Sequence, residues 1–197
     1  MQQKEVYMKN IATKILAIVV VVYTLVVVVS SVNIEEPAVA VEAKPVDSKQ
    51  LQCLAENIYH EAGNESLTGQ AAVAWVVINR VHHGFASTPC NVVYQTAWIT
   101  KLNEETLDEY KVRMCQFSWV CEGKARPNAT DPRYQRAKQV AYEVLAYDAY
   151  NEVLPRTALF FHNLTVDPLW PYKQVARIGN HIFYSKQKAT HNEVKSR

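Results

Sequence analysis

The stretch QAAVAWVVINRV, residues 70–81, decides the fold of this 197-residue chain. Every residue from Ala71 to Ile78 is apolar. A helix that is apolar on every side is buried on every side, so we expect this stretch to be the central core helix. It ends in Asn79 and Arg80, whose polar groups need partners if they are enclosed. Capping of the helix end and a functional role are both open for these two residues.

An amphipathic helix is expected before the core helix, over residues 48–62, with Asp47 as its N-cap. Apolar residues recur there at helical spacing: Leu51, Leu54, Ala55, Ile58, Tyr59 and Ala62. Glu61 shares a stripe with these residues, so its carboxylate lies at the edge of a buried face. Lost hydration raises the pKa of such a carboxyl toward the range of a general acid. The alternative is that Glu61 merely decorates a helix end, with Gly63 as the left-handed residue that stops it.

A third helix is expected after Asp131-Pro132, which places proline at the first helical position. Its apolar period continues to about Tyr147. Between the core helix and this one, residues 91–98 are typical of a short helix or turn. The acidic stretch 100–110 is typical of a solvated loop.

Strand signals are concentrated in the C-terminal part of the chain. Residues 158–161 are typical of a short strand, and Gly179-Asn180 suits a two-residue turn between strands 174–178 and 181–185. Together the elements predict an α+β domain that is mainly helical, with a small β-hairpin element.

The N-terminal segment is typical of a membrane anchor. Residues 15–32 carry no charge and are apolar apart from four hydroxyl-bearing side chains. Eighteen helical residues span about 27 Å, close to the thickness of the hydrocarbon core. Lysines precede the segment and glutamates follow it, so the positive-inside rule places the N-terminus in the cytoplasm. The alternatives are a cleaved signal peptide, for which Ala38-Val39-Ala40 resembles a cleavage site, and an anchor that later leaves the membrane.

The chain therefore divides into five expected parts. They are a short cytoplasmic N-terminus (1–14), a transmembrane signal-anchor (15–32), a linker (33–47), the main domain (48–187) and a flexible tail (188–197). We expect a single-pass protein of the cytoplasmic (inner) membrane whose main domain is periplasmic or otherwise extracytoplasmic. We expect it to act as a monomer.

The four cysteines favour two disulfides, because export places them in an oxidising compartment. Three pairings are open. The pairing that we favour closes a small loop between Cys115 and Cys121 and leaves Cys53 with Cys90. No C-x-x-C occurs and no histidine lies at a ligand interval, which argues against a zinc site. We expect neither a metal nor a cofactor.

Several function classes are excluded by the sequence. The net charge is only +2 and no basic patch occurs, so nucleic acid is not an expected partner. His60-Glu61 begins like the zinc-protease motif H-E-x-x-H, but residue 64 is asparagine. A nucleophile elbow and a phosphate-binding glycine loop are absent. What remains is acid–base chemistry by a carboxylate, which is characteristic of glycosidic-bond cleavage.

Five ordered blocks resemble the SleB-type cell-wall hydrolases, a family that includes the spore cortex-lytic enzymes. The blocks are LAENIYHEA (54–62), GQAAVA (69–74), VINRV (77–81), CQFSW (115–119) and IGNHIFY (178–184). They cover about residues 50–185, essentially the whole main domain. The resemblance implies a lysozyme-like α+β fold and cleavage of the peptidoglycan glycan strand between MurNAc and GlcNAc.

The resemblance also implies roles for two glutamates. The first glutamate of the family's G-E-A-R-G-E-like motif falls on Glu61, the implied catalytic acid/base, and the second falls on Glu65. The motif here reads H-E-A-G-N-E, so Gly63 replaces the usual arginine and Asn64 the usual glycine. Family members resemble lytic transglycosylases, in which one glutamate protonates the leaving oxygen. The same glutamate then deprotonates a hydroxyl of the sugar itself, which leaves an anhydro end.

Amides, hydroxyls and aromatic faces suit sugar recognition, so the other candidates would line the glycan cleft. They are Glu65, Gln116, Phe117, Ser118, His162, Asn163 and His181. Ordinary capping and core hydrogen bonds are the alternative for each. The predicted function is a membrane-anchored lytic transglycosylase for wall lysis or remodelling, either a phage endolysin or a cellular enzyme. The alternatives are a two-carboxylate muramidase and a non-catalytic, membrane-tethered glycan-binding module.

Overall fold

The computed structural model describes residues 14–24 and 42–188 and divides the chain into two units, Met1–Val41 and Glu42–Arg197. In the first unit, residues 14–24 form a helix. The predicted transmembrane helix is contradicted: within the described residues no helix combines the length and the apolar character that crossing a membrane requires. Residues 25–32 of that prediction, and most of the predicted linker and tail, lie outside the described residues.

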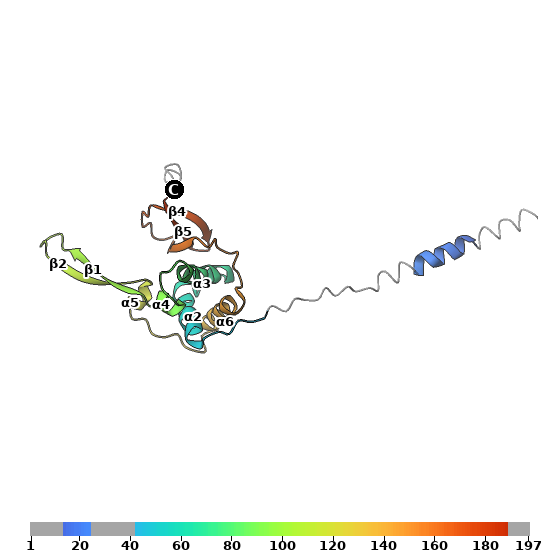
Figure 1. Cartoon of the computed structure of the whole chain (residues 1–197), viewed down its shortest axis with the longest axis horizontal. Helices are drawn as coiled ribbons and strands as arrows, with labels where there is room; N and C mark the ends of the chain where they lie inside the picture. Colours follow the sequence, from blue (N-terminus) through green and yellow to red (C-terminus); the bar gives the residue numbers. More distant parts are fainter. Residues whose placement is uncertain (1–13, 25–41, 189–197) are drawn as a thin grey trace, which may run out of the picture. The chain divides into compact units, whose positions relative to one another are not determined.

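Three helices form the body of the second unit (Figure 1). They are α2 (Ser48–Ala62), α3 (Leu67–His82) and α6 (Pro132–Tyr147). Each N-terminus is capped by a side chain that accepts a backbone N–H: Asp47 from Lys49, Ser66 from Gly69 and Asp131 from Arg133. The predicted starts at Asp47 and Asp131 are confirmed, whereas α3 begins three residues earlier than predicted because Ser66 caps it.

Helix α3 is the central core helix, as predicted. Its residues from Gly69 to Val77 are buried, and Trp75 is 2% exposed. The polar end of the helix is buried as well, and its side-chain donors have partners. Asn79 donates to the carbonyls of Pro155 and Ala158, and Arg80 Nε donates to the carbonyl of Leu159. These two side chains therefore join the helix to the strand that follows residue 157.

That strand belongs to a three-stranded antiparallel sheet of order β3-β5-β4. Its strands are β3 (Ala158–Asn163), β4 (Tyr172–Ile178) and β5 (His181–Lys188). The predicted hairpin is confirmed: Gly179, with φ of +56°, and Asn180 form the turn between β4 and β5. Alternate residues of β5 face the core, where Phe183 is fully buried.

A second, two-stranded sheet corrects the predicted fold class. Strands β1 (Thr96–Leu102) and β2 (Glu109–Cys115) pair antiparallel, where we predicted a short helix or turn and then a loop. We call this hairpin the arm; it extends away from the helices (Figure 1). The acidic residues that suggested a loop lie mainly in its turn. The domain is therefore mixed α/β, with five strands among the described residues, rather than mainly helical with one small hairpin.

Two short helices and two disulfides complete the domain. Cys53 in α2 is bonded to Cys90 in α4 (Pro89–Val93), and Cys115 at the end of β2 to Cys121 in α5 (Ser118–Cys121). This is the pairing that the sequence favoured. The first bond ties α4 to the middle of α2, and the second fixes the base of the arm.

Candidate active site

Glu61 lies in the last turn of α2, and its carboxyl is half-buried. Leu54 and Ile58 on the same helix stripe are fully buried, as the spacing predicted. Burial raises the pKa of Glu61 to about 7, although the positive charges of Lys124 and Arg80 oppose the shift. Among the described residues, none donates a hydrogen bond to this carboxylate. It is a carboxyl that still holds its proton in about half of the molecules at pH 7 and is free to meet a ligand.

A cavity of about 390 Å³ surrounds Glu61. Three elements line it: the end of α2 with the turn after it, the first turn of α6, and the edge of the three-stranded sheet. The lining residues are Tyr59, His60, Glu61, Ala62, Gly63, Asn64, Glu65, Arg133, Asn163 and Asn180. Glu61 is thus placed where helices and sheet meet, with room for a ligand beside it.

The turn after Glu61 differs from the turn that we expected. Gly63 is right-handed, with φ of −60°, rather than left-handed, and its N–H donates to the carbonyl of Tyr59 at 3.1 Å. A side chain at this position would collide with that carbonyl. The backbone therefore continues the helical turn past Glu61, and close packing rather than handedness accounts for the glycine.

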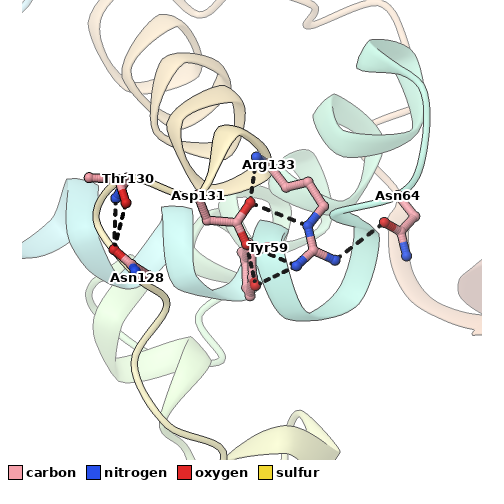
Figure 2. A network of polar contacts seen from close by, with 6 residues as sticks. All are labelled: Tyr59, Asn64, Asn128, Thr130, Asp131 and Arg133. Atoms are coloured by element: carbon pink, nitrogen blue, oxygen red, sulfur yellow. Dashed lines mark hydrogen bonds and ion pairs between the residues drawn. The ribbon is translucent and has the colours of Figure 1, made fainter.

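The rim of the cavity is a polar network around Arg133 (Figure 2). The guanidinium donates to the Tyr59 hydroxyl at 2.9 Å, to Asp131 at 2.8 Å and to Asn64 at 3.5 Å. It also lies over the Tyr59 ring, 5.1 Å from the centroid. The Tyr59 hydroxyl in turn donates to Asp131 at 2.8 Å. These bonds hold an oriented cation at the mouth of the cavity.

Sequence reasoning missed Arg133 and Tyr59 as site residues. Asp131 was noticed only as a helix cap, yet its carboxylate also binds Arg133 and Tyr59. The Arg133 hydrogen bonds lower the pKa of Asp131 well below its ordinary value. The only signal in the sequence was the arginine two residues after the cap. Nothing local linked it to α2, which is about seventy residues away along the chain.

Glu65 lies in the same cavity but is held by partners. Its carboxylate accepts the Asn180 side-chain amide at 2.9 Å and the Asn180 backbone N–H at 3.3 Å. Gly179 and Gly69 approach it so closely that a side chain at either position would press on Glu65. Glu65 therefore connects the turn after α2 to the β4–β5 turn.

The CQFSW block lies beneath the site rather than in the cavity lining. With its amide oxygen turned toward Arg80, Gln116 accepts from that guanidinium at 3.0 and 3.3 Å. The Phe117 ring lies 5.2 Å from the same guanidinium. Burial lowers the pKa of Arg80 to about 10, and the negative charge of Glu61 opposes this. Gln116 and Phe117 thus support a buried cation near Glu61, while Ser118 begins the short helix α5 and hydrogen-bonds Glu122.

The three candidate site residues on the sheet lie in three different environments. Asn163 lines the Glu61 cavity, as predicted. His181 is buried against Phe161 and Phe183, and burial lowers its pKa although Glu65 opposes the shift. His162 lies on the other face of the sheet, where Nε2 is 2.8 Å from the Tyr184 hydroxyl. Within the described ranges, no group of three His, Cys, Asp or Glu residues is arranged to hold a metal ion.

The fold and this site define an enzyme-like cleft, in which one buried carboxyl is poised for acid–base chemistry between a helical body and a small sheet. A family model described as cell wall hydrolase matches residues 64–184, more than half of the chain. The chain belongs to the cell wall hydrolase family. The prediction of a cell-wall-degrading enzyme is therefore confirmed, and the non-catalytic alternative is not supported. Glu61 lies three residues before the matched range.

Two solved structures are similar to this chain. One is the catalytic domain of the germination-specific lytic transglycosylase SleB from Bacillus anthracis, with 22% identity and a TM-score of 0.51; the match covers 72% of this chain and 98% of that one. The other is the catalytic domain of the Bacillus cereus SleB protein, with 21% identity and a TM-score of 0.48, covering 72% and 94%. The likeness to the first shows a related fold. No curated protein matches the chain.

Proposed function

We propose that this protein cleaves the glycan strand of peptidoglycan between MurNAc and GlcNAc, with Glu61 as the acid/base. The observation that carries the proposal is the state of Glu61. It is a half-buried carboxyl with a pKa of about 7, in a cavity of about 390 Å³, and it receives no hydrogen bond from the described residues. A general acid must hold its proton at the working pH and release it to a ligand, and this environment favours both.

The reaction begins with Glu61 protonated. It gives its proton to the glycosidic oxygen, the bond to the anomeric carbon breaks, and positive charge develops on the sugar ring. The Glu61 carboxylate then takes a proton from a hydroxyl of the same sugar. That oxygen bonds to the anomeric carbon, which forms the anhydro end and regenerates protonated Glu61. No water is consumed and no second carboxylate is needed.

The partners of Glu65 support this one-carboxylate route. Its carboxylate is engaged by both N–H groups of Asn180, so it is poorly placed to activate water. The similar Bacillus anthracis protein is described as a lytic transglycosylase, which agrees with the proposal. The second candidate is a two-carboxylate muramidase, which is favoured by one observation: Glu65 lines the same cavity as Glu61.

The deciding experiment is mass analysis of the products that the full chain releases from purified peptidoglycan. We expect anhydro ends, and we expect the Glu61→Gln variant to release almost nothing. Reducing ends that disappear in Glu65→Gln would instead establish the muramidase. If Glu61→Gln cleaves as fast as the wild type, Glu61 is not the acid/base.

We also propose that the domain acts outside the cytoplasm. The two disulfides, Cys53–Cys90 and Cys115–Cys121, support this, because such bonds persist in oxidising compartments. A thiol assay of the denatured protein, taken directly from its native compartment, tests this location: two or more free thiols would contradict it.

A further inference from the structure

A second cavity, of about 680 Å³, lies on the face of the β3-β5-β4 sheet that points away from the core. On β5, His181 and Phe183 face the core, whereas Ile182 and Tyr184 line this cavity. We call it the outer hollow. Its lining residues are His162, Leu164, Val166, Asp167, Gln174, Val175, Ala176, Arg177, Ile182 and Tyr184. Neither the family match nor the proposed reaction gives this cavity a role.

The wall of the outer hollow is mostly aliphatic, and aromatic rings lie next to it. Leu164, Val166 and Ile182 contribute branched apolar side chains. The rings that line it, His162 and Tyr184, stack on each other with centroids 5.3 Å apart and share a hydrogen bond. Tyr184 is 4% exposed. The Trp170 ring packs edge-on against both, with centroid distances of 5.6 Å to His162 and 5.7 Å to Tyr184, so an aromatic cluster borders the aliphatic wall.

Two opposite charges lie at the same cavity without neutralising each other. Arg177 is exposed, and no described residue accepts a hydrogen bond from its guanidinium or forms an ion pair with it. The Asp167 carboxylate accepts the backbone N–H of Leu169 at 3.3 Å, and no cation of the described residues lies within 4.0 Å of it. The outer hollow thus offers one cation and one anion to a ligand, above an aliphatic wall.

This combination fits a short peptide that has small aliphatic side chains and carries both a free carboxylate and a free ammonium group. A guanidinium binds a carboxylate through two parallel hydrogen bonds, and a carboxylate pairs with an ammonium. A neutral saccharide can hydrogen-bond to both groups but neutralises neither charge. A polyanion would meet a single cation and be repelled by Asp167.

Residues that are adjacent in the chain line the outer hollow and the Glu61 cavity. His162 lines the first and Asn163 the second. The N–H of Leu164 donates to the carbonyl of Asn180 at 2.9 Å, and Asn180 also lines the Glu61 cavity. The two cavities therefore meet at the end of β3, where one hydrogen bond joins a residue of the outer hollow to a residue of the Glu61 cavity.

We propose that the outer hollow binds the peptide branches of peptidoglycan and so selects glycan strands that still carry them. This rests on the proposed function for the identity of the polymer, but the binding itself can be measured without any cleavage. Arg177 receives a carboxylate of the branch, Asp167 its ammonium group, and the aliphatic wall its alanine methyl groups.

The test is titration calorimetry on the full chain with the synthetic pentapeptide N-acetyl-L-Ala-γ-D-Glu-L-Lys-D-Ala-D-Ala, in which the acetyl group replaces the amide bond to the glycan. We expect Arg177→Gln and Asp167→Asn each to weaken binding at least about tenfold, the effect of losing a charge-assisted contact. Arg113→Gln, which removes an exposed arginine from the arm, is the matched control and should bind as the wild type does. Raised salt should weaken the wild-type interaction.

Cleavage gives a second measurement. We expect a lower KM for wall fragments that carry peptides than for strands stripped of them, and Arg177→Gln should abolish the difference without changing kcat. The proposal is overturned if the pentapeptide does not bind, or if it binds all variants equally. It is also overturned if chitotetraose binds instead and the same two substitutions abolish that binding.

The two proposals fail separately. Glu61→Gln should lose cleavage and keep the affinity for the pentapeptide. If the wild type binds the pentapeptide through Arg177 but cleaves no glycan, the peptide-binding role of the outer hollow is supported and the proposed reaction is wrong. If it cleaves glycan and never binds the pentapeptide, the reaction stands and the outer hollow has been assigned wrongly.

Discussion

Two neighbouring regions, the end of helix α2 and the turn that follows it, place two glutamates in opposite situations. Glu61 and Glu65 are four residues apart and line one cavity. Glu61 has lost water without gaining a hydrogen bond, and its pKa rises to about 7. Glu65 accepts two hydrogen bonds from Asn180. Position in a cavity is therefore not enough to assign a catalytic role, because the partners of a carboxylate decide what it can do.

The two regions also differ in the contacts that hold their glutamate side chains in place. Glu61 continues the buried stripe of Leu54 and Ile58, so the helix itself sets its environment. Glu65 lies outside the helix and is confined by Gly69, Gly179 and Asn180. In the first region the burial of Glu61 is unfavourable, but it raises the pKa of the carboxyl toward the value that a general acid needs. The second region joins the helix to the sheet. Each prediction below separates these two roles.

The largest expected effect is the loss of activity in Glu61→Gln. Removing a general acid costs about 100- to 10,000-fold in rate, and we expect glycan cleavage to fall within or below that range. The measurement is initial-rate release of soluble fragments from purified peptidoglycan. Glu65→Gln is the matched control, since an amide oxygen can still accept from Asn180, and it should keep at least about one tenth of the activity. Equal losses of activity in Glu61→Gln and Glu65→Gln would show that the two glutamates do not differ in role.

The pH dependence of cleavage should report Glu61 alone. The acid must be protonated in the first step, and its pKa is about 7. Above that pH its protonated fraction falls, so kcat/KM should decrease about tenfold per pH unit. Rates measured from pH 5 to 9 check this. A profile that stays flat up to pH 9, or a high-pH limb that Glu65→Gln displaces, would show that another group supplies the proton.

The Glu65 region should be sensitive to a methyl group at Gly179. Gly179 has φ of +56°, and a side chain there would overlap the Glu65 carboxylate. We expect Gly179→Ala to lower the free energy of unfolding by about 2–4 kcal/mol, the sum of left-handed strain and overpacking. Gly84→Ala is the control, because Gly84 has φ of +74° but no atom within 4 Å of the added carbon. It should cost about 1–2 kcal/mol. Urea unfolding of both variants measures the difference. Equal losses of unfolding free energy would show that the added methyl group at residue 179 does not press on the Glu65 carboxylate.

Burial of Glu61 should also cost stability at neutral pH. Its pKa in the folded protein, about 7, lies above the ordinary value of 4.5, so the folded state holds the proton more tightly. The contribution of Glu61 to stability is therefore fully present below pH 4.5 and is lost as the pH rises through 7. Glu61→Gln removes this loss. The free energy of unfolding of the variant minus that of the wild type should therefore be about 1–3 kcal/mol larger at pH 8 than at pH 4. Urea unfolding at the two pH values measures it, and a difference that does not change with pH would contradict the burial of the Glu61 carboxyl.

The sequence predicted the parts of this molecule that depend on local pattern. Helical spacing gave α2, α3 and α6, Gly179-Asn180 gave a hairpin turn, and the buried stripe drew attention to Glu61. The arm was missed because its acidic turn favoured a loop, although the strand β2, EYKVRMC, alternates polar and apolar residues and so carried a strand signal. Its acidic turn resembles any solvated loop.

The rest of the candidate site depends on contacts between distant residues. Asn180 is 115 residues from Glu65, and Arg133 is 74 residues from Tyr59. Such pairs leave no spacing signal in a single sequence. His162 and Asn163 show the same limit at close range: they are adjacent on β3, but the pleat sends them to different cavities. Which residues share a cleft could not be predicted before the strand register was known.

The smallest effect is the coupling between Glu65 and Gly179. If the methyl group of Gly179→Ala is costly because it meets the Glu65 carboxylate, then Glu65→Ala makes room for it. In the Glu65→Ala background, Gly179→Ala should cost only the strain that Gly84→Ala shows, so the two changes couple by about 1 kcal/mol. The measurement is a double-mutant cycle of unfolding free energies. Additive costs would mean that backbone strain alone makes Gly179 necessary, and the connection between the α2–α3 turn and the sheet would then rest on Asn180 alone.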